Sequence, residues 1–453
     1  MDENNVAVGD VQIPLHRRIA ENLSNQVSSG KLKPGERLPS ERQIARQFQA
    51  SRATVRTALQ HLEQAGLITR RERRSAVVSI RRDLVPFLRI ACSNPRLIHL
   101  FSRLDELQLL PPRCQLQLSD LQQVGALGRL VSQPTTATDM LIFDLEHTNL
   151  FKMEPEQYQS LPRRLWSEWH VSGEFQEIFF QDNNYFAVPL SITPQVVYLN
   201  RSHLRDSQVE IPAKGWRWEQ FTEIIQRLTV SGRYGFQFRP SFNHLAEIML
   251  RRGGDFYQGD GVIAAHSCPH FEETVRFIHD MVHVFKASPI LAKADQINLF
   301  ADNRCAMALD GFEMYHFYKE KLGDNLGITV LPKVDGGSGI ISGFGALSPS
   351  RQEESQPVHD LLRALLSTSV QRTFMQIGGG LPVRTDLSNT ETLEAQNIDR
   401  GAIQIFLNEL KSCKPAHQPF HVEHKRAVEN LFLELWLGLD NIESICRRFK
   451  EID

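Results

Sequence analysis

Apolar residues recur at helical spacing near the start of the chain. Within residues 14–30 they stand four residues apart, at Leu15, Ile19, Leu23 and Val27. This segment begins with a proline and ends with a glycine. Residues four apart share one face of a helix, and proline and glycine are common at its two ends. The pattern predicts an amphipathic helix here.

Two further helices are predicted after a turn over residues 33–39. The segment "SERQ" has the form of a capping box, with Ser40 as N-cap and Gln43 three residues later. This second helix ends near Ala50, and Ser51 can cap a third one. The inward-facing residues of the two helices are Ile44, Ala45 and Phe48, and Val55, Leu59 and Leu62. Two helices joined by a short turn are typical of a helix-turn-helix.

The third helix begins with "SRATVR", and two short β-prone runs follow over residues 66–80 around an arginine-rich tip. Arg and Thr at the start of such a helix can reach guanine edges and phosphates. A charged, solvated helix surface is the alternative for "SRATVR" taken alone. The complete order of three helices and a basic hairpin favours DNA binding.

Charge separates this segment from the rest of the chain. Residues 1–82 carry 15 Lys+Arg against 8 Asp+Glu, a balance of +7, and the remaining residues carry 36 against 45, a balance of −9. A basic segment joined to an acidic body indicates an anionic partner for the segment alone.

Residues 30–68, "GKLKPGERLPSERQIARQFQASRATVRTALQHLEQAGLI", resemble the GntR-type winged helix-turn-helix almost position for position, and the resemblance extends over residues 12–79. It implies that double-stranded DNA is contacted by Arg42, Arg52, Thr54, Arg56 and the hairpin tip. The family turns this hairpin through two glycines, where this chain has Arg73 and Ser75. The tip is therefore expected to hold phosphates through Arg70, Arg71, Arg73 and Arg74.

Beyond residue 86 strand-like and helix-like patterns alternate. Residues 87–93, 113–119 and 139–145 read as strands, and residues 95–107 read as a helix. Such alternation predicts a parallel sheet with crossover helices, whose ligands lie beyond the carboxyl ends of the strands. By position alone the candidates are Ser93, Asn94, Asp144 and Glu146. Loop solvation or helix capping is an equally good interpretation of the two acids.

Residues 86–451 resemble an extracytoplasmic solute-binding protein of the carbohydrate class. Eight segments match in order, among them "TDMLIFDLEHTNLF", "LFADNRCAMALDGFEMYHF" and "GGLPVRTDL". The resemblance implies a ligand held between two lobes by aromatic and polar side chains. Carried onto this sequence, lobe one offers Asp144, Glu146, Thr193 and Phe344, and lobe two offers Phe242, Asn243, Gly311 and Phe312. Trp216 and Trp218 are expected to pack rather than to contact ligand.

The expected fold is therefore multidomain: a winged helix-turn-helix (α+β) followed by a two-lobed α/β fold of the periplasmic-binding-protein type 2. We expect the DNA-binding domain at residues 1–79, a linker at 80–86 and the effector domain at 87–453. Lobe one covers about 87–191 and 333–375, and lobe two covers about 192–332 and 376–453.

Together the two resemblances imply a transcriptional regulator that senses a carbohydrate or a similar small polar solute. Winged helices gain affinity by pairing on palindromic sites, so a homodimer is expected. No run approaches 18 apolar residues and the N-terminus is acidic and polar, so we expect no membrane span and a cytoplasmic location. The six cysteines form no CxxC pair, which indicates buried free thiols.

Enzymatic alternatives have weaker support. "HDMVH" at residues 279–283 resembles a zinc-protease helix, but both histidines fall on the solvated side of the predicted stripe. The glycine-rich residues 336–345 lack a GK[ST] and read as the start of a strand. No lysine has the setting of a pyridoxal-phosphate Schiff base, so no cofactor is expected. The alternative to a pure sensor is a C-terminal enzyme domain, either a glycosidase that uses two acids between the lobes or a pyridoxal-phosphate aminotransferase-like domain.

Overall fold

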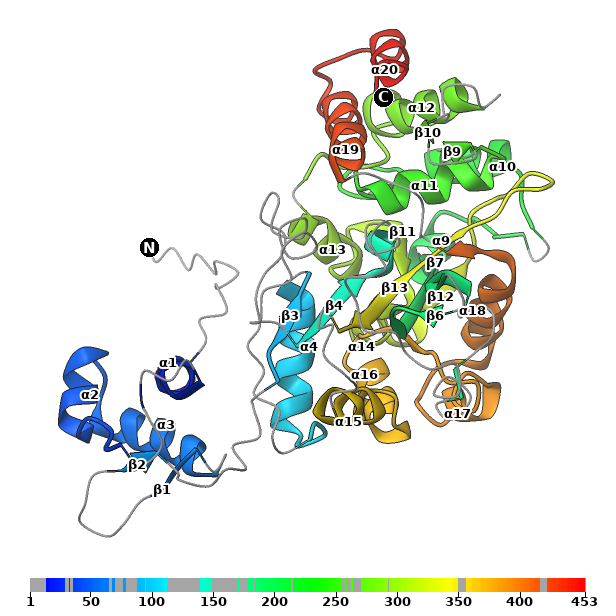
Figure 1. Cartoon of the computed structure of the whole chain (residues 1–453). Coiled ribbons are helices and arrows are strands. Elements are labelled where there is room, and N and C mark those ends of the chain that lie inside the picture. Colours follow the sequence, from blue (N-terminus) through cyan, green and yellow to red (C-terminus); the bar gives the residue numbers. More distant parts are fainter. Residues whose placement is uncertain are drawn as a thin grey trace, which may run out of the picture. The chain divides into compact units, whose positions relative to one another are not determined.

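The structure is a computed structural model of the chain. It describes residues 14–28, 32, 36–64, 67–69, 76–78, 88–93, 95–111, 139–148, 170–171, 177–181, 184–212, 215–254, 257–258, 262–263, 270–291, 293–348, 356–415 and 422–452. Two compact units are present: residues 1–89 with 111–117, and residues 90–110 with 118–453. Each unit is described by itself (Figure 1).

Three helices make up most of the N-terminal unit: α1 (Leu15–Ser28), α2 (Glu41–Gln47) and α3 (Arg52–Gln64). The predicted capping box is confirmed, because Ser40 and Gln43 bond each other's backbone N–H groups at the start of α2. The predicted inward face of α3, with Val55, Leu59 and Leu62, is fully buried in the core of this unit. Local capping and apolar periodicity thus define all three helices.

A small hairpin completes this unit. Strand β1 (Ile68–Thr69) pairs antiparallel with β2 (Val77–Val78), and residues Glu36 to Leu38 bond the outer side of β2. Ile68 and Val78 are directly opposite each other and both are buried against the helices. The predicted winged hairpin is therefore present, while its tip at residues 70–75 lies outside the described residues.

The second unit is built on one mixed, nine-stranded sheet (Figure 1). Its main path runs β3-β4-β13-β7-β11-β8, and β12, β14 and β15 pair at the side of that path. The strands are β3 (Ile90–Cys92), β4 (Met140–Asp144), β7 (Val188–Asn200), β8 (Tyr234–Gln237), β11 (Cys305–Gly311), β12 (Leu326–Thr329), β13 (Ile340–Leu347), β14 (Leu381–Pro382) and β15 (Lys414–Pro415).

Strand β7 is thirteen residues long, fully buried, and shared by two halves of the sheet. Residues 188–194 pair with β13, and residues 195–199 pair with β11. We call the part with β3, β4, β13 and β14 the first half, and the part with β8, β11 and β12 the second half. The passage from one half to the other falls between Pro194 and Gln195.

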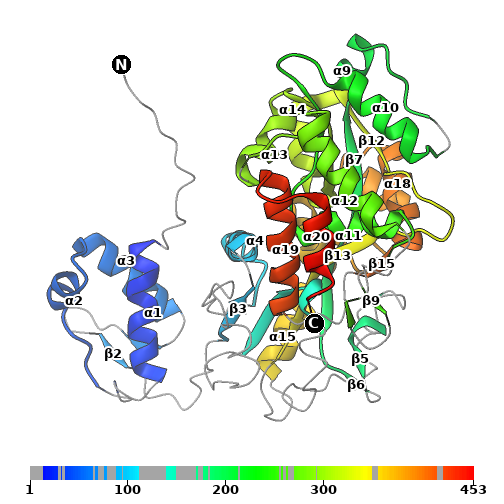
Figure 2. The same cartoon turned by 90° about the horizontal axis from the view of Figure 1, so that it is seen from above.

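Helices cover both halves (Figures 1 and 2). Near the first half lie α4 (Pro95–Glu106), α15 (Gln356–Leu365) and α16 (Thr368–Gln376). The large apolar core of the second half includes α10 (Trp218–Leu228), α11 (Phe242–Arg251), α12 (Phe271–His279), α19 (Val422–Leu437) and α20 (Ile442–Phe449). The remaining helices are α9 (Arg201–Asp206), α13 (Lys293–Ala301), α14 (Tyr315–Leu322), α17 (Thr390–Glu394) and α18 (Arg400–Ser412).

Shorter elements complete the described chain. They are the 3-10 turns Leu145–His147, Glu177–Phe179, Phe312–Met314 and Gly323–Asn325, the strand pair β5 (Phe180–Gln181) with β6 (Asn184–Tyr185), and the strand pair β9 (Tyr257–Gln258) with β10 (Val262–Ile263).

The expectation of a parallel sheet is right at the edges of the sheet and wrong at its centre. β3 with β4 and β8 with β11 are parallel pairs, but β4–β13, β13–β7 and β7–β11 are antiparallel. The alternation of elements does not reveal this, because β7 and β13 join the sheet from distant parts of the chain. The predicted strand at 113–119 lies outside the described residues.

The described cysteines are free, as predicted. Cys92 and Cys305 are buried, and Cys413 and Cys446 are half-buried. Burial raises the pKa of the Cys305 thiol to about 12. Trp216 and Trp218 also pack as expected, each with less than a tenth of its surface exposed. In the described part of the chain, no helix is long and apolar enough to cross a membrane.

Candidate DNA-binding and ligand-binding sites

The start of α3 presents polar side chains to solvent. Ser51 caps the helix by accepting a hydrogen bond from the Thr54 N–H at 3.1 Å, and the two hydroxyl oxygens lie 2.8 Å apart. Arg52 is exposed at the first helical position. Backbone N–H groups and an exposed guanidinium at one helix end are suited to bind phosphate.

Arg56 is tied to the neighbouring helix rather than isolated. Its Nε donates a hydrogen bond to Oε2 of Glu41 at 3.0 Å, in a pair whose arginine side chain is 67% exposed. Arg42 beside Glu41 is exposed as well. An exposed ion pair of this kind contributes little stability, so the arginine can exchange its carboxylate for phosphate at small cost. The predicted contacts Arg70, Arg71, Arg73 and Arg74 lie outside the described residues.

In the second unit, polar groups gather where β7 passes between the two halves. Gln195 is paired with Gly311 at the end of β11, and Thr193 lies two residues earlier on the same face of β7. A Cβ atom at Gly311 would overlap both the carboxylate of Glu313 and the methyl group of Thr193. Glycine at this position therefore lets the side chains of Glu313 and Thr193 approach each other.

Arg96, from the first turn of α4, reaches the same place from the first half. Its Nη1 lies 3.5 Å from Oε1 of Glu313, and its Nη2 donates to the carbonyl oxygen of Gly378. Its guanidinium also lies 6.0 Å from the centre of the Phe344 ring. Arg96 thus holds one oxygen of a carboxylate that is only 14% exposed.

A buried ion pair lies beside Gly311. Nη2 of Arg239 is 2.5 Å from Oδ1 of Asp310, and the Tyr318 hydroxyl donates to Oδ2 of Asp310 at 2.7 Å. His244 contacts both the backbone N–H and the guanidinium of Arg239. Burial raises the pKa of Asp310, an effect that the nearby Arg239 opposes. The guanidinium therefore offsets part of the cost of burying this carboxylate.

Several buried polar atoms near this point have no hydrogen-bond partner among the described residues. They are Oε1 of Gln195, both amide atoms of Gln237, Nη1 of Arg239, Oδ1 of Asn243 and Oε2 of Glu313. Buried polar groups are nearly always paired, so such a group of atoms requires an explanation. We call Thr193, Gln195, Gln237, Arg239, Asn243, Asp310, Gly311 and Glu313 the crossover cluster.

The structure brings three of the predicted ligand residues into the crossover cluster: Thr193, Asn243 and Gly311. Asp144 lies at the end of β4, where Oδ2 accepts a hydrogen bond from the Ser93 hydroxyl at 2.6 Å. Phe344 is its direct neighbour on β13. The side chain of Glu146, together with Asn94, lies outside the described residues.

Phe242 and Phe312 are packed inside the protein in this conformation, with 2% and 1% of their surface exposed. The Phe312 ring stands edge-on to Phe406 at 4.8 Å and is nearly parallel to Tyr315 at 6.2 Å. The backbone N–H of Phe242 donates to Glu429 at 3.0 Å. Both aromatic rings therefore contribute to packing, and their contact with ligand stays a prediction.

Sequence reasoning missed Gln195, Arg239 and Glu313. One signal for Gln195 was available, because it is the single amide in the apolar run "PQVVYL" of a buried strand. Nothing local marks Glu313, which follows Phe312 in an ordinary helix start. Its place depends on the pairing of β11 with β7 and on Arg96 from α4.

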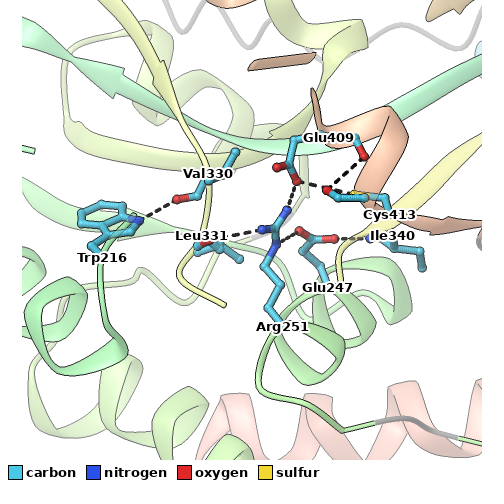
Figure 3. Close-up of polar contacts among 9 residues, drawn as sticks. Trp216, Glu247, Arg251, Val330, Leu331, Ile340, Glu409 and Cys413 are labelled. Carbon is cyan, nitrogen blue, oxygen red and sulfur yellow. Dashed lines mark hydrogen bonds and ion pairs between the residues drawn. The ribbon is translucent and has the colours of Figure 1, made fainter. Parts of the chain in front are cut away.

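A second buried polar group, in the second half, is fully paired (Figure 3). Arg251 on α11 forms ion pairs with Glu247 one turn earlier and with Glu409 on α18, and its Nη1 donates to the Leu331 carbonyl at 3.2 Å. Glu247 also accepts from the backbone N–H of Ile340, at the start of β13, at 2.6 Å. We call these three charged residues the Arg251 cluster.

No group of three or more His, Cys, Asp or Glu in the described part of the chain could hold a metal ion. Residues Asp280–Val284 form a π-helical turn rather than a continuation of α12. His279 lies beside Asp280, and Nε2 of His283 lies 2.9 Å from the Leu435 carbonyl oxygen. The two histidines thus have protein partners.

Two family descriptions match the chain. "Bacterial regulatory proteins, gntR family" matches residues 15–78, and "Bacterial extracellular solute-binding protein" matches residues 167–398. The second match covers more than half of the chain.

Curated relatives match each part separately. The HTH-type transcriptional repressor NagR of Bacillus subtilis is 46% identical over 67 residues, which are 15% of this chain and 28% of that protein. An uncharacterized lipoprotein of Streptomyces antibioticus is 28% identical over 194 residues, which are 40% of this chain and 43% of that protein. The chain thus spans less than half the length of these relatives.

Solved structures of similar fold cover most of the chain. A solute-binding protein of Thermotoga lettingae bound to α-D-tagatose has a TM-score of 0.67 at 16% identity, and covers 81% of this chain and 98% of its own. Maltose-bound MalE3 of T. maritima has a TM-score of 0.67 at 14% identity. The match covers 81% of this chain and 99% of MalE3. At such low identity the likeness shows the fold.

Proposed function

Because the chain belongs to the bacterial extracellular solute-binding protein family and carries a GntR-type winged helix-turn-helix, we propose that it is a transcriptional regulator controlled by a sugar. The N-terminal unit binds operator DNA, and the second unit binds the effector. NagR is a repressor and the two similar solved structures are ligand-binding proteins, so we assign no catalytic activity. DNA binding requires a cytoplasmic location.

The observation that carries the effector role is the crossover cluster. Its unpartnered buried atoms lie where β7 joins the two halves, so a ligand bound there contacts both halves together. A ligand shifts a conformational equilibrium only by its different affinities for the two states. Tagatose and maltose, bound by the similar proteins, identify small carbohydrates as the first compounds to test.

The exposed start of α3 supports the DNA-binding role. Arg52 and Arg56 are directed to base edges and phosphates of the major groove, with Arg42 and the basic hairpin tip on the backbone. A homodimer places two such helices on a palindromic operator. If effector binding changes the spacing of the paired helices, DNA must in turn change effector affinity by the same factor.

The proposal is tested in two steps. A thermal-shift panel of mono- and disaccharides and polyols on the full-length protein identifies the effector, since a ligand at a hundredfold excess over its Kd stabilises the native state by about 2.7 kcal/mol. Selection from random duplex DNA supplies the operator. Operator affinity is then measured with and without effector, and Arg52→Ala is expected to weaken specific binding by about 1–3 kcal/mol.

Two results contradict the proposal. Selection that recovers no preferred DNA sequence excludes specific operator binding. Operator affinity that is unchanged by every compound that binds the second unit excludes control by that effector.

A further inference from the structure

The outer face of α19 is apolar where an exposed helix face is normally polar. Arg426, Asn430, Leu433 and Leu437 follow one another at intervals of three and four residues, so they form one stripe along the helix, and all four are exposed. Leu433 is 41% exposed and Leu437 is 43% exposed. We call these four residues the α19 face. The buried side of the helix belongs to the core that it shares with α11, α12 and α20 (Figures 1 and 2).

The leucines of the α19 face continue into further exposed apolar residues. Leu439, just past the end of α19, is 72% exposed, and Val284, at the end of the π-helical turn, is 57% exposed. Nε2 of His283 lies 2.9 Å from the Leu435 carbonyl oxygen, so this turn borders the last turn of α19. Single exposed apolar residues are ordinary, but a group of them on adjoining segments marks an interaction surface.

The two ends of the α19 face carry opposite charge. Arg426, near the start, is exposed and has no ion-pair partner in the described part of the chain. Near the end, Arg448 pairs with both Glu434 and Asp440, so two carboxylates share one guanidinium and a negative charge remains. The helix dipole opposes a cation near the start of a helix and an anion near its end. An antiparallel helix of the same sequence compensates the charge at both ends.

The α19 face is therefore complementary to itself. Leu433 stands seven residues after Arg426 and seven residues before Asp440. A two-fold axis at Leu433 brings the Arg426 end of one copy to the Asp440 end of the other, with leucines from both copies between them. Symmetric dimers use the same patch on both partners in this way.

We propose that the α19 face binds the α19 face of a second copy of this chain, with the two helices antiparallel and the Leu433 side chains at the two-fold axis. The inference rests on the proposed function, because a regulator that reads a palindromic operator needs two copies. It adds the surface through which the two effector-binding units pair.

Sedimentation of the full-length protein over a range of concentrations tests the pairing. Leu433→Glu places two carboxylates against each other at the axis, so we expect the dimer dissociation constant to rise about a hundredfold or more. Leu107→Glu is the matched control, because Leu107 follows α4 and is 44% exposed, and it should leave the dimer unchanged. Circular dichroism equal to that of the unchanged protein checks that both variants are folded.

Disulfide cross-linking supplies a second readout, which does not require the dimer to be weakened. Leu433→Cys places two thiols near the axis, so mild oxidation should join the two chains through a disulfide. The same oxidation of the unchanged protein and of Leu107→Cys should leave the chains separate. Arg426→Glu should weaken the dimer only about three- to tenfold, because its charge is exposed to solvent.

Three results overturn the inference: a protein that is monomeric at every concentration, whose α19 face then serves another partner, a dimer that Leu433→Glu leaves intact, or a dimer that Leu433→Cys does not cross-link. None of them decides whether an effector alters operator affinity. A dimer that pairs through the α19 face, while no bound compound alters operator affinity, supports the inference and contradicts the proposed function.

Discussion

The Arg251 cluster and the crossover cluster are both buried polar groups around an arginine, yet they differ in how completely they are paired. In the Arg251 cluster, two carboxylates, a carbonyl and a backbone N–H account for the charged atoms (Figure 3). In the crossover cluster, atoms of Gln195, Glu313 and Arg239 lack partners. The two clusters therefore differ in how much free energy their burial costs the protein.

A buried cluster in which every charged group has a partner favours one arrangement of the segments that it joins. Arg251 and its partners connect α11, α18 and the start of β13, so they set the geometry of the segments that lead into the sheet. An unsaturated cluster instead carries an unfavourable free energy that a ligand can remove. The contrast is the reason why we treat the Arg251 cluster as structural and propose the crossover cluster as the ligand site.

The largest expected effect is on stability, from Arg251→Met. The substitution leaves Glu247 and Glu409 buried without their cation, which should lower the free energy of unfolding by about 3–5 kcal/mol. Urea unfolding checks this, with Arg448→Met in the more exposed pair with Glu434 as control, expected to cost about 0–1 kcal/mol. Equal loss in both variants would contradict the distinction between a buried and an exposed network.

Phe312→Ala tests whether the neighbour of the crossover cluster is also part of the core. If Phe312 were only a ligand contact, as the resemblance implies, the variant would lose sugar binding at an unchanged melting temperature. Because the ring is buried against Phe406, we now expect the free energy of unfolding to fall by about 3–5 kcal/mol as well. An unchanged urea midpoint with lost affinity would restore Phe312 as a pure ligand contact.

One glycine lies beside each cluster, Gly339 beside Arg251 and Gly311 beside Glu313, and the two allow a matched comparison. A Cβ atom at Gly339 would lie 2.6 Å from the Cys413 sulfur and 2.7 Å from Nη2 of Arg251, so Gly339→Ala should cost about 1–3 kcal/mol of stability. Gly311→Ala should instead displace the Glu313 side chain and weaken effector binding. Thermal melting and calorimetry of both variants check this, and a reversed pattern would exchange the two assignments.

A smaller effect concerns pH. Burial lowers the pKa of His316, whose ring packs against Phe312, so the folded protein takes up this proton less readily than the unfolded chain, in which a histidine titrates near pH 6.5. Stability from this histidine is present above that pH and is lost as the pH falls below it. His316→Phe should reduce the loss of stability between pH 7.5 and 5.5.

The reduction is at most about 1.4 kcal/mol per pH unit, because one proton is involved. Urea unfolding at the two pH values measures it. Burial also lowers the pKa of His203. This second histidine leaves some pH dependence of stability in the variant. A pH dependence identical to that of the unchanged protein would show that His316 titrates alike in both states.

Much of the N-terminal unit could be predicted because its signals are local. Ser40 and Gln43 form their capping box within four residues, and the buried face of α3 follows from apolar spacing. In the second unit, α4 and β4 were also predicted from local pattern. The antiparallel centre of its sheet was not, because β7 pairs with strands from distant parts of the sequence.

The sequence by itself determined the two kinds of domain and the helix α3 with its arginines, since these depend on neighbouring residues and on motifs. Only the tertiary structure brought Gln195, Arg239 and Glu313 together around Gly311. That meeting depends on the register between β7 and β11 and on an arginine from α4. Register and long-range packing depend on the whole fold, so no short stretch of sequence contains them.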